Sequence, residues 1–307
     1  MSAMADSALD FSIIVPTYNR PRQLGECLTA LVSLEYSHER FEVVVVDDGG
    51  TTPLDDVTAS FHGGLGLIVV RSANAGPAAA RNLGAAHARG RYLLFTDDDC
   101  RPRPNWLRAL EARGRSARGA LLGGRTLNAL PGNRCSALSQ LIVDVVYAHY
   151  NADPDNARFF ASNNLAAPAA RFHALGGFDP EFRTAEDRDL CDRWLGDGGR
   201  LVYVPDAVVD HAHALTVRGL WRQHFGYGRG AYRFHRSPAR RGRNSLRIEG
   251  RLYREFVRYP YAHERTARAV SLTLLLVVQQ AANAAGFAAE WIESFRRSRV
   301  TRAAAGP

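Results

Sequence analysis

The sequence predicts an α/β fold with a doubly wound, mainly parallel sheet, followed by a basic helical region. Three observations lead to this expectation. Short apolar runs alternate with helical patterns over the first hundred residues, polar residues follow each run, and the charge changes sharply after residue 215. With 307 residues, 46% hydrophobic and 23% charged, the chain has an ordinary globular composition and enough length for a sizeable core.

Four short apolar runs have the length and composition of buried strands. Between the first two, leucines and a cysteine recur at helical spacing over Gln23–Leu34. Between the last two, Pro77 suits the first turn of a helix that runs to about Ala88. Alternating strands and helices predict a mainly parallel sheet. The four predicted strands are Phe11–Val15, Phe41–Val46, Leu65–Val70 and Tyr92–Thr96.

The following hundred residues are less regular, but they still predict both helices and strands. Trp106–Ala112, Ser136–Tyr150 and Glu186–Leu195 have helical patterns. Ala120–Thr126 and Leu201–Val204 have the apolar composition of strands.

Polar residues cluster directly after each of the first four predicted strands. Because ligands of open α/β sheets bind outside the carboxyl ends of the strands, these clusters predict one binding edge. The clusters are Thr17 with Asn19, Asp47 with Asp48, Asn74 with Arg81, and Asp97 with Asp98 and Asp99.

The last cluster places three carboxylates in a row. Adjacent carboxylates repel one another, so they need either a solvated turn or a cation. Hard divalent cations such as Mg²⁺ and Mn²⁺ prefer carboxylate and phosphate oxygens. The residues alone leave both interpretations open.

Other features exclude some classes of function. The four cysteines are widely spaced without a C-x-x-C pair, which indicates a reducing compartment and no zinc site. The chain contains no G-x-G-x-x-G or P-loop sequence. Its N-terminus lacks the basic and apolar regions of a signal peptide. All 39 basic residues are arginine, which we interpret as composition bias.

The C-terminal third is strongly basic and then uncharged. Thr216–Arg268 holds fourteen arginines and three glutamates, a local charge of +11 within a net charge of +8. This asymmetry predicts an anionic partner. Ala269–Ala289 has no charge and the length of a membrane span, but Gln279, Gln280 and Asn283 interrupt it. A buried helix, an interfacial helix and a span remain open, while the flanking arginines and Trp291 favour a membrane surface.

The ordered motifs resemble the family 2 glycosyltransferases with a GT-A fold. The resemblance covers roughly Phe11–Pro205, and the ordered set is specific although no single member is. It implies a nucleotide-binding half and an acceptor-side half, a nucleotide-sugar donor, a divalent metal and inversion at the anomeric carbon. The motifs are IIVPTYNR from Ile13, VDDG from Val46, NAG from Asn74 with ARN from Ala80, FTDDD from Phe95, and GGFD from Gly176 with Glu186 and Asp187.

On the donor side, the resemblance implies that Asp99 ligates the metal. Asp97 would lie near the ribose or a metal-bound water, and Asp98 would contact the ribose. Asp48 would accept a hydrogen bond from the base, unless it caps a helix or turn instead. Arg81 would pair with the diphosphate or with Asp97, unless it forms a structural ion pair. The residues packing around base, ribose and diphosphate would be Pro16, Thr17, Tyr18, Arg20 and Gly76.

On the acceptor side, the resemblance implies that Asp187 is the catalytic base and that Glu186 binds the acceptor. The alternative is an acidic pair stabilised by a helix N-terminus. Asp189 is a further candidate for the base, and Asn163 and Asn164 are candidates for the donor-sugar pocket. His211 or His213 would add a metal ligand, or instead serve structure or acceptor binding.

The leading hypothesis is therefore an inverting transfer from a UDP-, dTDP- or GDP-linked sugar, dependent on Mn²⁺ or Mg²⁺. The acceptor would be a glycan or a lipid-linked glycan, and the protein would be cytoplasmic and peripheral on the inner face of the cell membrane. Two alternatives are a sugar-nucleotide nucleotidyltransferase, which the absence of glycine in Val15–Asn19 disfavours, and a nucleic-acid-binding module using the arginines.

The sequence also predicts the organisation of the chain. We expect a disordered N-terminus over 1–10, a glycosyltransferase domain over 11–215 and an arginine-rich helical segment over 216–268. An apolar, membrane-associated helix over 269–294 and a disordered tail over 295–307 complete the prediction.

Overall fold

The computed structural model describes residues 9–236 and 250–304 and contains two compact units. The first unit comprises the chain up to Ala129 together with 147–181 and 186–213. The second comprises 130–146, 182–185 and the chain from Ala214 onward. The sequence predicted disorder over 1–10, but Asp10 is buried and accepts a hydrogen bond from Tyr36 over 3.0 Å. Residues 1–8 and 305–307, also predicted to be disordered, lie outside the described residues.

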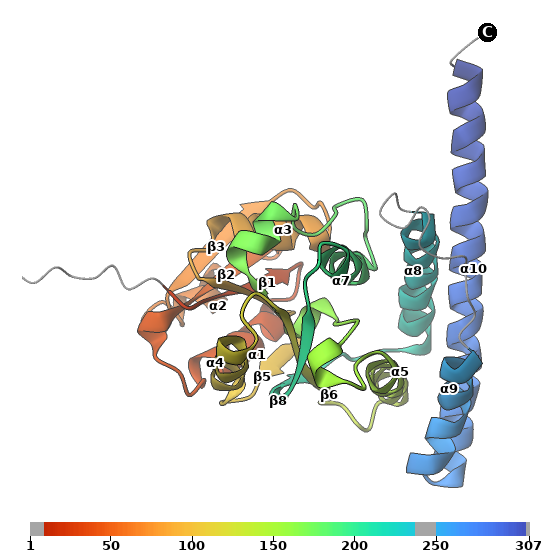
Figure 1. Cartoon of the computed structure of the whole chain (residues 1–307), viewed down its shortest axis with the longest axis horizontal. Helices are drawn as coiled ribbons and strands as arrows, with labels where there is room; N and C mark the ends of the chain where they lie inside the picture. The colour runs from red at the N-terminus through yellow and green to blue at the C-terminus, as the bar shows by residue number, and fades with distance from the viewer. Residues whose placement is uncertain (1–8, 237–249, 305–307) are drawn as a thin grey trace, which may run out of the picture. The chain divides into compact units, whose positions relative to one another are not determined.

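The first unit is built on one eight-stranded sheet with the order β3-β2-β1-β4-β7-β6-β8-β5 (Figure 1). The four predicted N-terminal strands are its first four members. The strands are β1 Phe11–Thr17, β2 Phe41–Asp48, β3 Leu67–Ser72, β4 Tyr92–Phe95, β5 Cys100–Pro102, β6 Leu121–Asn128, β7 Leu165–Pro168 and β8 Leu201–His211.

The sheet has a parallel half and a mixed half. Strands β1 to β4 pair in parallel, as the alternation of strands and helices predicted. Strand β7 is antiparallel to both β4 and β6, β6 and β8 are parallel, and β5 is antiparallel to β8. The α/β prediction is confirmed, but the sequence did not predict the short strands β5 and β7.

Helices cover both faces of the parallel half, which explains why its strands are continuous apolar runs. On one face, Ile13 and Val15 join a core with residues of α1 and α4. On the other face, α3 lies so close that a Cβ at Gly84 would be 2.5 Å from Ile14 Cγ2. The helices of this unit are α1 Pro21–Val32, α2 Asp55–Ala59, α3 Pro77–His87, α4 Trp106–Ser116, α6 Ala169–Ala174 and α7 Glu186–Gly196.

The second unit is helical. It contains the first part of α5 Arg134–Tyr150 together with α8 Val217–Arg236, α9 Gly250–His263 and α10 Thr266–Ala304. Its apolar core joins side chains from all four helices, including Leu138, Leu220, Phe256 and Leu272. Residues 295–304 are helical, where the sequence predicted disorder, because α10 continues without a break.

Helices α8 and α10 cross closely, and small residues allow this approach (Figure 1). A Cβ at Gly228 would lie 2.0 Å from the Asn283 carbonyl oxygen, and one at Gly286 would lie 1.9 Å from that of Phe225. Gln279 and His224 are hydrogen-bonded at 3.1 Å within this contact. Two of the polar residues that interrupt the apolar C-terminal stretch, Gln279 and Asn283, therefore lie against α8.

Candidate active site

The carboxyl ends of β1 and β4 are joined by hydrogen bonds to Asp98. Thr17 Oγ1 donates to Asp98 Oδ2 over 2.7 Å, and Arg20 Nη1 donates to Asp98 Oδ1 over 3.1 Å. Arg20 also reaches Asp99 Oδ2 at 3.3 Å. Burial raises the pKa of Asp98 to about 6, although Thr17 and Arg20 act in the opposite direction. The fold thus brings together two of the motifs that the sequence identified.

Arg81 links the first residue of the acidic run to the start of α7. Its Nη2 donates to Asp97 Oδ1 over 2.6 Å and its Nη1 donates to Glu186 Oε1 over 2.9 Å. The Arg81 side chain is only 5% exposed. Of the partners that the sequence suggested for Arg81, the structure shows Asp97, and it adds Glu186, which the sequence did not predict.

Asp99 lies between two imidazoles. His211 Nε2 is 3.1 Å from Asp99 Oδ1, and His213 Nδ1 is 3.1 Å from Asp99 Oδ2. The two rings stack with centroids 5.0 Å apart. Although burial alone would raise the pKa of Asp99, hydrogen bonds from the histidines hold it well below its usual value. Burial alone would lower the pKa of His211, but Asp99 raises it.

This group of side chains fits a divalent cation. Each oxygen of the Asp99 carboxylate contacts one imidazole, and carboxylate and imidazole are both common metal ligands in proteins. Cys100 Sγ also lies within 4.8 Å of ligand atoms of Asp99 and His211. However, Cys100 is fully buried in the apolar core beneath the sheet. Asp99 and His211 are therefore the candidates for a cation site, and His213 contacts the other oxygen of Asp99.

Asp48 and Gly76 meet at the start of α3. Asp48 accepts hydrogen bonds from the backbone N–H groups of Ala75 at 2.8 Å and of Gly76 at 3.0 Å. The Asp48 carboxylate therefore stabilises the turn before α3, as expected if Asp48 caps a helix or turn. Each of its oxygens retains a second lone pair. Gly76 has φ +93°, a left-handed conformation that favours glycine.

The acidic pair Glu186–Asp187 opens α7. Asp187 accepts the backbone N–H groups of Arg188 at 2.7 Å and Ser162 at 3.3 Å. Burial and then the charge of Asp187 raise the pKa of Glu186 to about 7. Burial likewise raises the pKa of Asp187. Ala185, which precedes the pair, has φ +69°, and backbone strain of this kind clusters at functional sites.

Two predicted or candidate residues have internal partners that favour structural roles. Asn164 is 1% exposed, and its amide bonds Trp106 Nε1 and two backbone carbonyls. Asp189 is buried and pairs with Arg193 at 2.7 Å. Neither side chain has the exposure that a sugar contact or an acceptor base needs. Asn163 is partly exposed and accepts a hydrogen bond from Thr126 at 3.3 Å.

The remaining predicted residues lie at the end of β1 and in the loop that follows it. Pro16 is half-buried, and the Tyr18 ring is 50% exposed, so it is accessible for stacking. Asn19 has a role that the sequence did not predict. Its Oδ1 accepts the backbone N–H groups of Thr51 and Thr52 at 2.7 and 3.0 Å, which ties the loops after β1 and β2 together.

Comparison with known proteins finds a family match in the N-terminal part of the chain. Residues 12–129 match the family described as Glycosyl transferase family 2. This match covers 118 of the 307 residues, so the similarity to family 2 glycosyltransferases is established for that segment of the chain. This confirms the resemblance that the ordered motifs predicted, and the matched segment carries β1 to β6 with the acidic run.

The curated proteins to which the chain is similar include glycosyltransferases. The pre-mycofactocin glycosyltransferase of Mycobacterium tuberculosis is 28% identical over 214 residues, which is 68% of this chain and 44% of the relative. The poly(ribitol-phosphate) beta-N-acetylglucosaminyltransferase TarS of Staphylococcus aureus is 36% identical over 93 residues, 30% of this chain and 16% of TarS. The chain thus spans less than half the length of these two relatives.

Similarity to solved structures shows that the fold of this chain is GT-A-like. The mannosyltransferase PcManGT from Pyrobaculum calidifontis, solved with GDP-Man and Mn²⁺, has a TM-score of 0.64 at 20% identity. It covers 93% of this chain and 90% of its own. Residues 1–349 of TarS from S. aureus with UDP-GlcNAc give a TM-score of 0.56 at 18% identity, covering 94% and 92%.

Proposed function

We propose that the chain is an inverting, metal-dependent glycosyltransferase that moves a sugar from a nucleotide diphosphate to an acceptor hydroxyl. The observation that carries this proposal is the pairing of Asp99 with His211 and His213. A carboxylate and two imidazoles suit a divalent cation, in the same unit as the acidic pair of α7. The domain family and the ligands named for PcManGT and TarS support this interpretation.

Asp99, His211 and His213 would hold the cation. Mn²⁺ suits this set better than Mg²⁺, because Mg²⁺ prefers oxygen ligands alone. When bound, the cation supplies charge stabilisation to the departing diphosphate. Asp97 and Asp98 would then serve the ribose or the water around the cation, with Arg81 and Thr17 keeping their carboxylates oriented.

Around the nucleotide, the loops after β1 and β2 would form the base and ribose site. Tyr18 offers an exposed ring, and Asp48 retains lone pairs that can accept an N–H from a base. Pro16, Arg20 and Gly76 would complete the cradle. A UDP-, dTDP- or GDP-linked sugar fits this description equally.

On the acceptor side, Asp187 would accept the proton of the attacking hydroxyl. The acceptor oxygen forms its bond to the anomeric carbon as the bond to the diphosphate oxygen breaks on the opposite face, which inverts the configuration. Burial raises the pKa of Asp187, which makes it a better proton acceptor once ionised. Glu186 and Asn163 would contact the acceptor and the donor sugar, respectively.

The transfer proposal is tested by nucleotide-sugar turnover. Nucleoside diphosphate release from UDP-, dTDP- and GDP-linked sugars is measured with Mn²⁺ and with a chelator. The expected result is release from one donor class, abolished by the chelator. Pyrophosphate release from a nucleoside triphosphate plus a sugar phosphate would instead indicate the nucleotidyltransferase alternative. Tight, salt-sensitive oligonucleotide binding without turnover would indicate the nucleic-acid-binding alternative.

We also propose that the second unit binds the anionic inner face of the cell membrane. Among the described residues, α10 is the helix long and apolar enough to cross a membrane, and 28% of its apolar window is buried. It exposes an apolar stripe at alternating spacings of four and three residues, about 38 Å long at 1.5 Å per residue. The members of this α10 stripe are Val270, Leu274, Val277, Ala281, Ala284, Ala288, Trp291 and Phe295.

Helix α9 adds charge to this surface. Arg251, Arg254 and Arg258 are exposed beside the exposed Tyr253 and Val257. Arginines next to apolar and aromatic side chains match anionic lipid head groups above an acyl layer. A lipid-linked acceptor would be presented at this surface, and the cytoplasmic, peripheral location follows from the same argument.

A further inference from the structure

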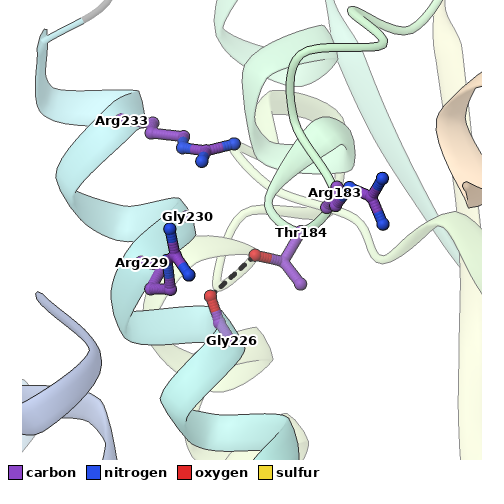
Figure 2. A pocket seen from close by; sticks show the side chains of 6 residues that line it. All are labelled: Arg183, Thr184, Gly226, Arg229, Gly230 and Arg233. Carbon is purple, nitrogen blue, oxygen red and sulfur yellow. Dashed lines mark hydrogen bonds between the residues drawn. The ribbon is translucent and has the colours of Figure 1, made fainter. Parts of the chain in front are cut away.

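The second unit contains a pocket lined by arginines (Figure 2). Its volume is about 380 Å³, which is room for a phosphorylated group and part of what it is attached to. Helix α8 forms one wall and the segment before α7 contributes the other residues. The lining consists of Arg183, Thr184, Gly226, Arg229, Gly230 and Arg233.

The walls of the pocket approach closely because α8 has glycine at two positions. Gly226 and Gly230 are four residues apart, so they lie on the same face of α8. Thr184 Oγ1 donates to the Gly226 carbonyl oxygen over 2.9 Å, as the dashed line in Figure 2 shows. A Cβ at Gly230 would lie 2.3 Å from Thr184 Oγ1.

Two of the arginines are held in place by glutamates of α10. Arg229 Nε and Arg233 Nε donate to opposite oxygens of Glu290 over 2.5 and 2.8 Å, and Arg229 Nη2 donates to Glu293 over 2.5 Å. The side chain of Glu290 is 4% exposed, whereas those of Arg229 and Arg233 remain 35% and 31% exposed. The guanidinium groups are thus oriented and still partly accessible.

The pocket retains positive charge after these pairings. The pocket is lined by three arginines, and two glutamates of α10 pair with them. One positive charge therefore remains uncompensated. Within residues 9–236 and 250–304, Arg183 forms no ion pair. Figure 2 shows Arg233 extending from α8 toward the segment that carries Arg183 and Thr184. An oriented guanidinium fork beside a hydroxyl group is suited to a phosphate, because it matches the oxygens in pairs.

We propose that this arginine pocket binds a phosphoryl group of the acceptor. The proposal rests on the proposed glycosyltransferase function. In the sequence, Thr184 precedes Asp187, the proposed base, by three residues, so one short segment supplies both the pocket and the base. The exposed apolar side chains of α9 and α10 in the same unit favour an acceptor whose phosphate is joined to a lipid chain.

The test uses the full chain, a chelator and no nucleotide. Calorimetry compares farnesyl phosphate, farnesol and inorganic phosphate as ligands. Farnesyl phosphate is expected to bind at least about 10-fold more tightly than farnesol, since a hydrogen bond to a charged group contributes about 1.5–3 kcal/mol. Arg183→Gln and Arg233→Gln should each reduce the farnesyl phosphate affinity about 10-fold. Arg222→Gln, another exposed arginine of α8, is the matched control and should bind like the wild type.

Equal affinities for farnesyl phosphate and farnesol would overturn the proposal, as would unchanged binding in both pocket variants. Binding of inorganic phosphate as tight as that of farnesyl phosphate would assign the pocket to a free anion and overturn the acceptor assignment. Arg183 is exposed, so its substitution keeps the test independent of folding. Failure of nucleotide-sugar turnover would contradict the proposed function without changing these binding results.

Discussion

Arg81 joins carboxylates from distant parts of the sequence. Its guanidinium bonds Asp97, 16 positions away, and Glu186, 105 positions away. A buried cation between two acids offsets repulsion that would otherwise separate them, and it fixes the distance between the acidic run and α7. This supports a donor site and an acceptor base in one arrangement.

At the residue scale, the base assignment predicts the effect of Asp187→Asn. The amide has nearly the same shape but cannot take the proton, so the transfer rate should fall about 10²- to 10⁴-fold. Nucleoside diphosphate binding should remain, because the substitution leaves the metal ligands intact. Asp197→Asn, at the exposed end of the same helix region, is the control and should keep the wild-type rate.

The raised pKa values predict how the rate depends on pH. A base acts in its deprotonated form, so the rate at saturating donor should rise with pH and level off above about 7, where Glu186 is also ionised. Glu186→Gln removes the neighbouring charge and should shift the rising limb to lower pH. A rate that falls with increasing pH over this range would contradict the assignment.

The sequence located most of the polar side chains that the fold brings together, but not their partners. Polar residues at strand ends were sufficient to predict Asp97, Asp98, Asp99 and Arg81. The structural role of Asn164 was not predictable, because its partner Trp106 lies 58 positions away and no spacing rule connects them. The backbone donors to Asp48 likewise depend on how the loop after β3 folds.

At the element scale, β8 shows where the sequence pattern is insufficient. The apolar pattern predicted a strand only over Leu201–Val204, yet β8 continues to His211. Its second half carries Pro205 and two aspartates, and its register shifts at Gly124–Arg125 of β6. Pairing with β5 extends β8 and places His211 beside Asp99. Strand β5 has only three residues, which is too short for its sequence to show an alternating pattern.

The close crossing of α8 and α10 predicts that Gly228→Ala is destabilising. The new Cβ would lie 2.0 Å from the Asn283 carbonyl oxygen, so the helices must separate. Overpacking of this kind costs about 1–3 kcal/mol, which thermal unfolding followed by circular dichroism would detect.

Gly219→Ala on the same helix is the matched control. Its Cβ would have ordinary contacts of 3.4 and 3.5 Å, and alanine is the better helix former by about 1 kcal/mol. It should unfold at the same temperature or higher. Equal destabilisation by both substitutions would mean that the crossing is looser than the structure shows.

At the scale of the whole molecule, charge and exposed apolar surface coincide in the C-terminal part. Thr216–Arg268 carries a local charge of +11, and the α10 stripe is exposed in the same unit. Composition predicted the anionic partner and left open how the apolar segment is used. Which residues of the apolar segment are buried and which are exposed depends on the packing of α8 against α10, and the sequence pattern alone does not show this.

The membrane proposal predicts that Leu274→Asp reduces binding to vesicles. Leu274 is 64% exposed in the α10 stripe, so a carboxylate there opposes insertion without disturbing the helix contacts. Wild-type protein should co-sediment with phosphatidylglycerol vesicles and less with phosphatidylcholine, and added salt should weaken binding. Leu195→Asp, an exposed apolar position of α7, is the control.

Unchanged co-sedimentation of the Leu274 variant would contradict the membrane proposal. A wild-type dimer that Leu274→Asp converts to a monomer would also contradict it, because a second copy of the chain would then cover the stripe. Size-exclusion chromatography with light scattering distinguishes these outcomes.

The most direct test of a metal-dependent nucleotide site is thermal unfolding with UDP, dTDP, GDP and CDP, each with and without Mn²⁺. Binding to the folded state raises the unfolding temperature, by about 2.7 kcal/mol of added stability at 100 times the dissociation constant. The account predicts that one diphosphate raises the unfolding temperature only when Mn²⁺ is present, and that Asp99→Asn abolishes the increase. An increase of the same size in Asp99→Asn, or no increase with any diphosphate in the folded wild-type protein, would contradict it.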